Sequence, residues 1–312
     1  MKINTIVLFS IGIAFVFGAC NKNNSSAPQE VKRRLTSYTL SDGTNNSLYS
    51  IKYNDNGKIT EIDVQTNGQP SAVWWTIEYS GNDIIMLDES SITNILRDTM
   101  RLTVDANGRR IKRIRGYFRQ DNGGTPSVEH LHDSSDYQYD ATGFLVKEIR
   151  HYGDTISYTN GDRTFSRTIE VFDYTNSNSN LASVVQVSND TVNKILSGMP
   201  STYITTRTIT ANLNYTKGSL NKTDFTNEAI IGQLYLFFPY IMHKEYGMVP
   251  QSMNYQQVRK RPDGTITGSS NDTYLFDFGY DSTGYIISKV QSAPTINGFP
   301  VLNYTFHYEP IP

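Results

Sequence analysis

The residues best suited to metal chemistry form the stretch Glu129-His130-Leu131-His132-Asp133. Side chains two apart on a β-strand point to the same face, so His130 and His132 would present two imidazoles together. A closed zinc site takes about four ligands, and this stretch offers two of the preferred type. The alternative interpretation is a polar segment ahead of the next strand. We therefore predict no metal and no cofactor, and keep His130 and His132 as the metal candidates.

The densest basic run is a candidate site for anionic ligands. It comprises Arg109, Arg110, Lys112, Arg113, Arg115 and Arg119. Arginines in such a run can meet the phosphates of lipid headgroups or acidic glycans, and we take Arg113 and Arg115 as the ligand-binding candidates. The alternative is a strand face that carries its charges in water.

Two adjacent tryptophans, Trp74 and Trp75, raise a question of orientation. Neighbouring strand residues point to opposite faces, so one core cannot accept both. Trp75 shares its parity with Val73, Ile77 and Tyr79, which leaves Trp74 on the other face. We interpret Trp74 as a stacking platform for a sugar or another flat ligand. The alternative is that the segment 227–240 covers it, because large aromatic side chains are mostly buried.

Motifs of common enzymes are absent from the chain. There is no G-x-S-x-G, no H-E-x-x-H and no phosphate-binding glycine loop. Carboxylates from distant strands still leave a glycosidase pair open. We therefore expect a non-catalytic binding or scaffolding module, with a glycan or an envelope protein as partner. The alternatives are a carbohydrate-active enzyme and a structural partner of an outer-membrane complex.

A short repeat indicates the elements that position these residues. Its four clear copies are Tyr53-NDN-Gly57, Val104-DAN-Gly108, Tyr139-DAT-Gly143 and Tyr280-DST-Gly284. Apolar residues alternate before each copy, as in a strand with one buried face. Asn, Asp and Gly then supply the conformations of a tight turn. After the turn the apolar spacing becomes three, as for Val146 and Ile149, which a β-bulge would explain.

With weaker copies included, the repeat predicts eight strand ends. They are Tyr53, Tyr79, Val104, Tyr139, Tyr174, Tyr215, Tyr280 and Tyr308. Aromatic residues make up 12% of the chain, which favours pleated sheet. We predict an all-β fold, an antiparallel β-meander of repeated hairpins that forms a strongly curved sheet or an open barrel. It would form one domain over residues 35–312.

Two segments break the β pattern. The apolar segment 227–247 can begin as a helix at Asn227 and contains Pro239, so we predict a helical insert that covers the sheet. The segment 189–200 is predicted to hold a short helical turn that ends at Gly198.

The N-terminus indicates export and anchoring. After Lys2, an apolar run without charges ends at Ala19, and it is shorter than the about 20 residues of a membrane-spanning helix. Residues 1–19 are therefore predicted to be a signal peptide. The ending Phe17-Gly18-Ala19-Cys20 resembles the signal of bacterial lipoproteins, which implies a lipid on Cys20. Residues 20–34 then form a flexible tether.

These features place the mature protein at the cell envelope. We expect an outer-membrane lipoprotein that faces the periplasm, with surface exposure left open. Its membrane contact would be the lipidated Cys20. The net charge of −2 gives no reason to expect nucleic acid as a partner.

The repeat also resembles two known groups. Its Tyr-Asp-x-x-Gly core, best seen at Tyr139 to Gly143, is similar to the YD repeat of large bacterial surface proteins related to the RHS family. The lipoprotein signal, the hairpin Tyr137 to Lys147 and the HKEYGMVP stretch resemble lipid-anchored proteins of Bacteroidota. These form a domain family of unknown function with a porin-like β fold. That resemblance implies a curved antiparallel sheet and no particular activity.

The anchor is tested by the substitution Cys20→Ser. Without the thiol no lipid can be attached, so we expect the protein to leave the membrane fraction or to be mislocalised when cells are fractionated. A Cys20→Ser variant that still sediments with membranes would show that Cys20 is not the anchor.

Overall fold

The described part of the chain is one closed β-barrel. The computed structural model describes residues 32–89, 95–121, 127–177, 180–215 and 250–311. They form sixteen antiparallel strands in sequence order, and β1 pairs with β16 to close the sheet. The compact unit runs from Arg33 to Pro312. The prediction of an antiparallel all-β meander is confirmed, whereas the prediction of an open barrel is wrong because the first and last strands pair.

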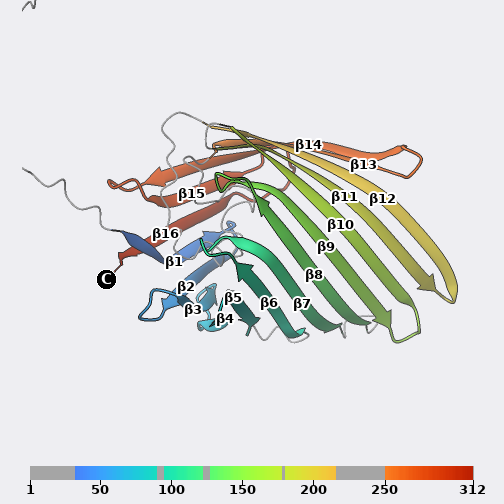
Figure 1. Cartoon of the computed structure of the whole chain (residues 1–312), viewed down its shortest axis with the longest axis horizontal. Coiled ribbons are helices and arrows are strands. Elements are labelled where there is room, and N and C mark those ends of the chain that lie inside the picture. The colour runs from blue at the N-terminus through green and yellow to red at the C-terminus, as the bar shows by residue number, and fades with distance from the viewer. Residues whose placement is uncertain (1–31, 90–94, 122–126, 178–179, 216–249, 312) are drawn as a thin grey trace, which may run out of the picture. The chain divides into compact units, whose positions relative to one another are not determined.

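The strands differ widely in length. The shortest has 6 residues and the longest has 17, so the wall is much taller around β8–β12 and β14 (Figure 1). Their bounds are β1 Arg33–Ser41, β2 Asn46–Tyr53, β3 Ile59–Thr66, β4 Ala72–Ser80, β5 Asp83–Asp88, β6 Ile95–Val104, β7 Arg110–Asp121 and β8 Ser127–Tyr139. The chain continues with β9 Leu145–Tyr158, β10 Arg163–Ser177, β11 Asn180–Leu196, β12 Met199–Asn214, β13 Ser252–Lys260, β14 Ile266–Tyr280, β15 Ile286–Ser292 and β16 Leu302–Pro310.

The repeat builds one end of the barrel. Its eight predicted positions lie at or within a few residues of the ends of the eight even-numbered strands. In the copy at Tyr139, the Asp140 N–H donates to the Phe144 carbonyl at 2.9 Å and the Gly143 N–H donates to the Asp140 carbonyl. The Asp140 carboxylate accepts from the Phe144 N–H at 3.0 Å, and Gly143 has a φ of 98°. The Asp and the Gly are therefore both required by the turn geometry.

A β-bulge follows each of the four clear turns, as the change in spacing predicted. Tyr139 pairs with Leu145 and Gln138 pairs with Lys147, so Val146 has no residue opposite it. The same shift leaves Ile111 and Ile287 without opposite residues. The bulge turns these side chains away from the apolar row that precedes the turn, which is why the spacing changes from two to three.

The repeated tyrosine joins the end of its own strand to the preceding strand, its neighbour in the sheet. The hydroxyl of Tyr79 donates to the Ile59 carbonyl at 2.9 Å, and that of Tyr139 donates to the Arg110 carbonyl at 2.9 Å. A cation from the same neighbouring turn covers each ring, with Lys58 Nζ 4.5 Å from the Tyr79 centroid. Tyr53 and Tyr215 make the same hydroxyl bond, to Leu35 and Leu181. The tyrosine thus fixes the end of one strand to the strand before it.

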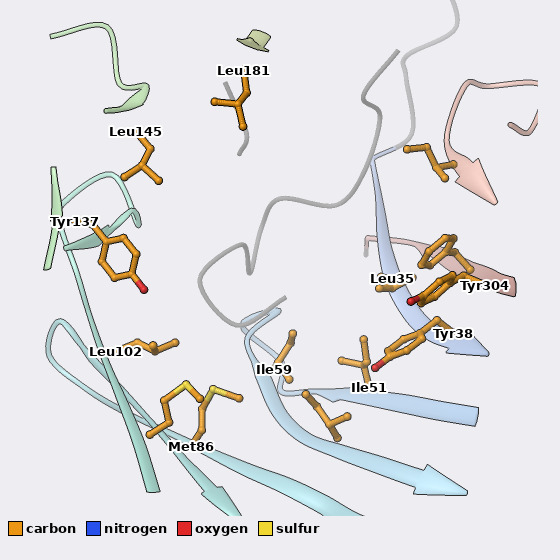
Figure 2. Packing of buried hydrophobic residues seen from close by; sticks show 14 of the residues in the cluster. Leu35, Tyr38, Ile51, Ile59, Met86, Leu102, Tyr137, Leu145, Leu181 and Tyr304 are labelled. Atoms are coloured by element: carbon orange, nitrogen blue, oxygen red, sulfur yellow. The ribbon is translucent and has the colours of Figure 1, made fainter. Parts of the chain in front are cut away.

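The barrel interior at this end is an apolar core. Residues of one parity on each strand are buried, and Figure 2 shows their side chains extending from the surrounding strands toward a common space. Tyr38 and Tyr49 stack there with ring centroids 4.4 Å apart. The side chains Leu35, Tyr38, Ile51, Ile59, Met86, Leu102, Tyr137, Leu145 and Tyr304 belong to this cluster.

The two predicted helical segments have different outcomes. The insert at 227–247 lies outside the described residues, and the described ranges contain no helix. The short helical turn predicted at 189–200 is wrong, because β11 runs straight to Leu196 and a two-residue turn at Ser197 and Gly198 leads into β12. Val184, Gln186 and Ser188 are buried on one face of β11. Burial at every second residue is the pattern of a strand and not of a helix.

The tyrosine contact predicts the effect of Tyr79→Phe. Burial raises the pKa of Tyr79 to about 12, so the hydroxyl stays a donor at neutral pH. Its loss removes one part-buried hydrogen bond, and we expect the free energy of unfolding to fall by about 1 kcal/mol in a denaturant titration. Tyr203→Phe, which alters an exposed ring, is the control and should have no effect. Equal midpoints for the two variants would contradict this role of the hydroxyl.

Candidate functional site

A row of polar and charged side chains crosses the interior wall beyond the apolar core. Six strands, β7 to β12, contribute one residue each, and every residue lies directly opposite the next in the sheet register. The row is Arg113, Ser135, Arg150, Glu170, Ser188 and Arg207. In register, Arg259 of β13 extends it by one strand. Because opposite residues of paired strands share a face, the whole row points into the barrel. We call it the interior charged row.

Two carboxylates hold the arginines of this row together. Asp133 lies on the same face of β8 as Ser135, two residues before it. Its carboxylate accepts from Arg150 Nη2 at 2.7 Å and from Arg150 Nε at 3.0 Å. It also accepts from Arg113 Nη2 at 3.0 Å. Paired charges of this kind offset the cost of burying them, whereas a single buried charge would not be tolerated.

Glu170 is the second centre of the network. Its Oε1 accepts from Arg207 Nη2 at 3.1 Å, from Ser188 Oγ at 2.7 Å and from Gln186 Nε2 at 2.8 Å. Its Oε2 lies 3.6 Å from Arg150 Nη1. Three hydrogen-bond donors from β11 and β12, together with the charge of Arg150 from β9, therefore fix this carboxylate in one orientation.

The network determines the ionisation of Asp133. Burial by itself would raise the pKa of Asp133, but hydrogen bonds and charge attraction from Arg150 and Arg113 outweigh burial and hold the pKa below its ordinary value. Asp133 is therefore an anion at neutral pH. A general acid for glycoside cleavage needs a raised pKa, so Asp133 is unsuited to that role.

A cavity of about 230 Å³ opens beside the charged row. It is lined by Arg150, Tyr152, Thr168, Glu170, Asp190 and Arg207. Tyr152, Thr168 and Asp190 form the next interior row, again in register. This small space is thus surrounded by two guanidinium groups, two carboxylates, a hydroxyl and a phenol. Such a lining suits a ligand with several hydroxyl groups, or one that carries both a positive and a negative charge.

The basic run of the sequence is divided between the two faces of β7. Arg110 and Arg113 are buried in the interior, and the guanidinium of Arg110 lies 5.0 Å from the Tyr137 ring centroid. Arg115 is opposite Asp133 in register, while Lys112 faces out. The alternative of a uniformly solvated face is therefore wrong for Arg110 and Arg113. The ligand-binding role of Arg113 and Arg115 stays a prediction.

The two histidine candidates lie together but on the outer face. His130 and His132 are both exposed, on the parity opposite to Leu131 and Asp133. They border a shallow outer depression of about 730 Å³ with His151. Among the described residues, no group of three or more His, Cys, Asp or Glu side chains is arranged to hold a metal ion.

Trp74 lies on the interior side, and the expectation that it faces away from Trp75 is wrong. Ile62 pairs with Trp75 and Asp63 pairs with Val73, so a bulge leaves Trp74 without an opposite residue. The bulge lets both indoles point inward. The Trp74 ring lies 5.2 Å from Tyr49 and packs against the core. Its role as a ligand platform stays a prediction, now for the interior.

Glu170, Ser188 and Arg207 were not among the residues predicted from the sequence. The alternation of inward and outward positions along each strand could have identified them. Glu170 shares the parity of Phe172 and of Tyr174, one of the predicted strand ends, and Arg207 shares that of Ile209. Polar residues at buried parity indicate an interior network, because a buried charge needs partners.

Lys289 is a further buried cation, in the apolar part of the interior. Its Nζ lies 4.0 Å from the Tyr304 ring centroid and donates to Gln291 Oε1 at 3.1 Å. Burial lowers its pKa to about 7. The side chain is only 2% exposed, so a substrate cannot reach it, and we treat it as structural.

The comparisons with known proteins agree with the barrel fold. A porin-like protein from Bacteroides vulgatus superimposes with a TM-score of 0.51 at 11% identity, over 90% of this chain and 100% of that one. A porin-like protein from Bacteroides uniformis gives a TM-score of 0.42 at 13% identity, over 88% and 96%. At 11% identity the first comparison shows a shared fold only. The expected porin-like β fold is thereby confirmed.

Neither sequence comparison finds a relative. No family model matches the chain, and no curated protein does. The likeness to YD-repeat proteins and the lipid anchor therefore stay predictions. In the described ranges there is no helix long and apolar enough to cross a membrane.

The burial of Lys289 predicts a pH dependence of stability. The folded pKa of about 7 lies below the ordinary 10.5, so between these values the unfolded chain binds more protons and stability rises with pH. Below pH 7 the full cost of the buried charge is present. We expect Lys289→Met to be more stable at pH 6 by a few kcal/mol, at about 1.4 kcal/mol per pKa unit.

The measurement is the free energy of unfolding from pH 6 to pH 10. The rise between pH 7 and pH 10 should be smaller in Lys289→Met than in the unaltered protein. Lys52→Met, which removes an exposed outer amine paired with Glu61 and Asp63, should bring no gain. A Lys289→Met variant with the original pH profile would disprove the assignment.

Proposed function

We propose that this protein is a non-catalytic envelope protein whose barrel binds a short oligosaccharide in its interior. The observation that carries the proposal is the interior charged row with the cavity beside it. Sugars offer hydroxyl groups that both donate and accept, and the cavity presents both guanidinium donors and carboxylate acceptors. Its volume of about 230 Å³ is below the about 300–1,000 Å³ of most small-molecule pockets, so it would enclose only part of an oligosaccharide.

The side chains on the outer face of the wall favour a barrel that is surrounded by water rather than by lipid. Charged side chains occupy the outward parity on strands far apart in the sheet. Examples are the ion pair Lys52–Asp63 on β2 and β3, at 2.9 Å, and Lys147–Asp173 on β9 and β10, at 3.5 Å. A charged residue facing lipid at mid-membrane costs about 2–4 kcal/mol. The lipid on Cys20, rather than the barrel wall, would then hold the protein at the outer membrane.

A second candidate is a carbohydrate-active enzyme. It is favoured by two carboxylates, Glu170 and Asp190, in the same cavity. Against it, Glu170 is already engaged by Arg207, Ser188, Gln186 and Arg150, and Asp133 is held ionised. A binding site needs such fixed groups, whereas an acid catalyst needs a proton to give.

The test is calorimetric titration with a panel of neutral and uronic-acid di- and trisaccharides. We expect at least one to bind, and Arg207→Met and Asp190→Asn each to weaken it about tenfold, the loss of about 1.4 kcal/mol that one charged hydrogen bond supplies. Arg207→Met leaves Glu170 three other partners, so the fold should persist. Arg101→Met, on the outer face, is the matched control.

The outcomes separate the candidates. Binding that Arg207→Met and Asp190→Asn leave unchanged places the ligand elsewhere, and no binding by any sugar rejects the proposal. Release of shorter sugars during the titration, abolished by Glu170→Gln, would establish the enzyme instead.

A further inference from the structure

The tip of the β11–β12 hairpin projects past the neighbouring wall of the barrel. β12 pairs with β11 from Met199, opposite Leu196, to Asn212, opposite Ser183. Its pairing with β13 begins only at Thr206. The residues before Thr206 are therefore bordered by β11 alone in the described structure, and Figure 1 shows this hairpin extending to a free end. We call residues 195–204 the apolar finger.

The apolar finger exposes large apolar side chains on both of its faces. The adjacent residues Tyr203 and Ile204 are 57% and 50% exposed, although neighbours on a strand point in opposite directions. Met199 at the turn is 71% exposed. The other exposed apolar side chains of the finger are Ile195 and Leu196. Neither face of this segment covers the barrel core, so packing inside the protein does not account for its composition.

The turn holds the finger in a fixed shape. Ser197 and Gly198 both have positive φ, 52° and 77°, as a two-residue type I′ hairpin turn requires. The Ser197 N–H donates to Asp162 Oδ1, in the neighbouring β9–β10 turn, at 2.6 Å. The apolar side chains are thus presented at the end of a rigid hairpin rather than on a loose loop.

The backbone of the apex is suited to an environment without water. In a two-residue hairpin, Leu196 and Met199 bond to each other, and the next residue of β12 directs its N–H toward the open edge. That residue is Pro200, which has no N–H. With the Ser197 N–H bonded to Asp162, the apex leaves few donors to be desolvated.

Cations outnumber anions near the finger. Residues 191–204 contain no Asp or Glu, and Lys194 is the one charged residue among them. Lys194 Nζ lies 5.6 Å from the centroid of the Tyr203 ring, and Arg163 stands opposite Ile195 on β10. Asp162 is the nearest carboxylate, and it is engaged by Ser197 and by Asn160 Nδ2.

We propose that the apolar finger inserts into the surface of a lipid bilayer that contains anionic lipids. Lys194 precedes the turn by three residues, or about 10 Å of strand, which matches the about 5–10 Å to which interfacial segments bury their apolar side chains. Leu196 and Met199 would enter the acyl boundary. Tyr203 and Lys194 would lie at the level of the headgroups, where tyrosines concentrate and basic side chains meet phosphates.

The test uses the chain from residue 21 onward, without signal or lipid, so that the finger is the contact measured. All sixteen strands lie within Arg33–Pro310, so this chain keeps the whole barrel. It is sedimented with vesicles of phosphatidylcholine alone and of phosphatidylcholine mixed with phosphatidylglycerol. We expect binding to the mixed vesicles, weakened by salt.

Two variants and a matched control isolate the finger. Leu196→Ser combined with Met199→Ser should reduce binding at least about tenfold, and Lys194→Gln should reduce the preference for phosphatidylglycerol. Ile111→Ser combined with Ile287→Ser changes two exposed isoleucines at the other end of the barrel and should bind like the unaltered chain. Because all these side chains are exposed, the melting temperature should not change.

A fluorescence readout reports insertion directly. The emission of Leu196→Trp should shift to shorter wavelength when mixed vesicles are added. The proposal is overturned if the unaltered chain binds neither vesicle, if the double finger variant binds as well as the control, or if Leu196→Trp emission does not shift. These outcomes are independent of sugar binding in the barrel interior and of the lipid on Cys20.

Discussion

Pairing of β1 with β16 is the constraint on which the rest of the structure depends. Because the sheet is closed, it encloses an interior of limited volume. The side chains at every second position of a strand point into this interior and must fill it. Around the short strands, aromatic and aliphatic residues do so. The tyrosine at the end of several even-numbered strands adds a fixed contact to this packing, because its hydroxyl bonds to the strand before its own, as that of Tyr139 does to the Arg110 carbonyl at the start of β7. Each hairpin is thereby fixed to the one before it.

The interior changes character where the wall becomes taller. From β7 to β12 the buried parity carries charged residues, and their partners come from strands one or two positions away in the sheet. Arg150 joins Asp133 to Glu170 across three strands. A network of this kind is favourable only when nearly every member has a partner, because unpaired buried charges are costly. The same requirement fixes the side chains beside the cavity, which is why the charged row is also the best candidate site.

Much of the fold follows from the sequence because its signals are local. The turn residues at Asp140 and Gly143 and the alternation before them define a hairpin within about fifteen residues, and the spacing after it predicted the bulge at Val146. Closure could not be predicted, since it depends on one pairing between the two ends of the chain. Trp74 was misplaced because a bulge in β4 changes parity without any turn residue to signal it. Parity within a strand indicates that Glu170 and Arg207 point inward, but only the register between strands brings them to the same height as Arg113.

The chain resembles porin-like proteins in fold. The fold does not determine how polar and apolar side chains are distributed between the outer and inner faces of the wall. In a membrane-spanning barrel the outward parity carries a continuous apolar band. Here the outward parity carries ion pairs such as Lys147–Asp173, and the inward parity carries the apolar core. Fold similarity records strand order and curvature, which both arrangements share, so it does not distinguish them. The side chains do distinguish them, because charged pairs on the outward face fit a wall in contact with water.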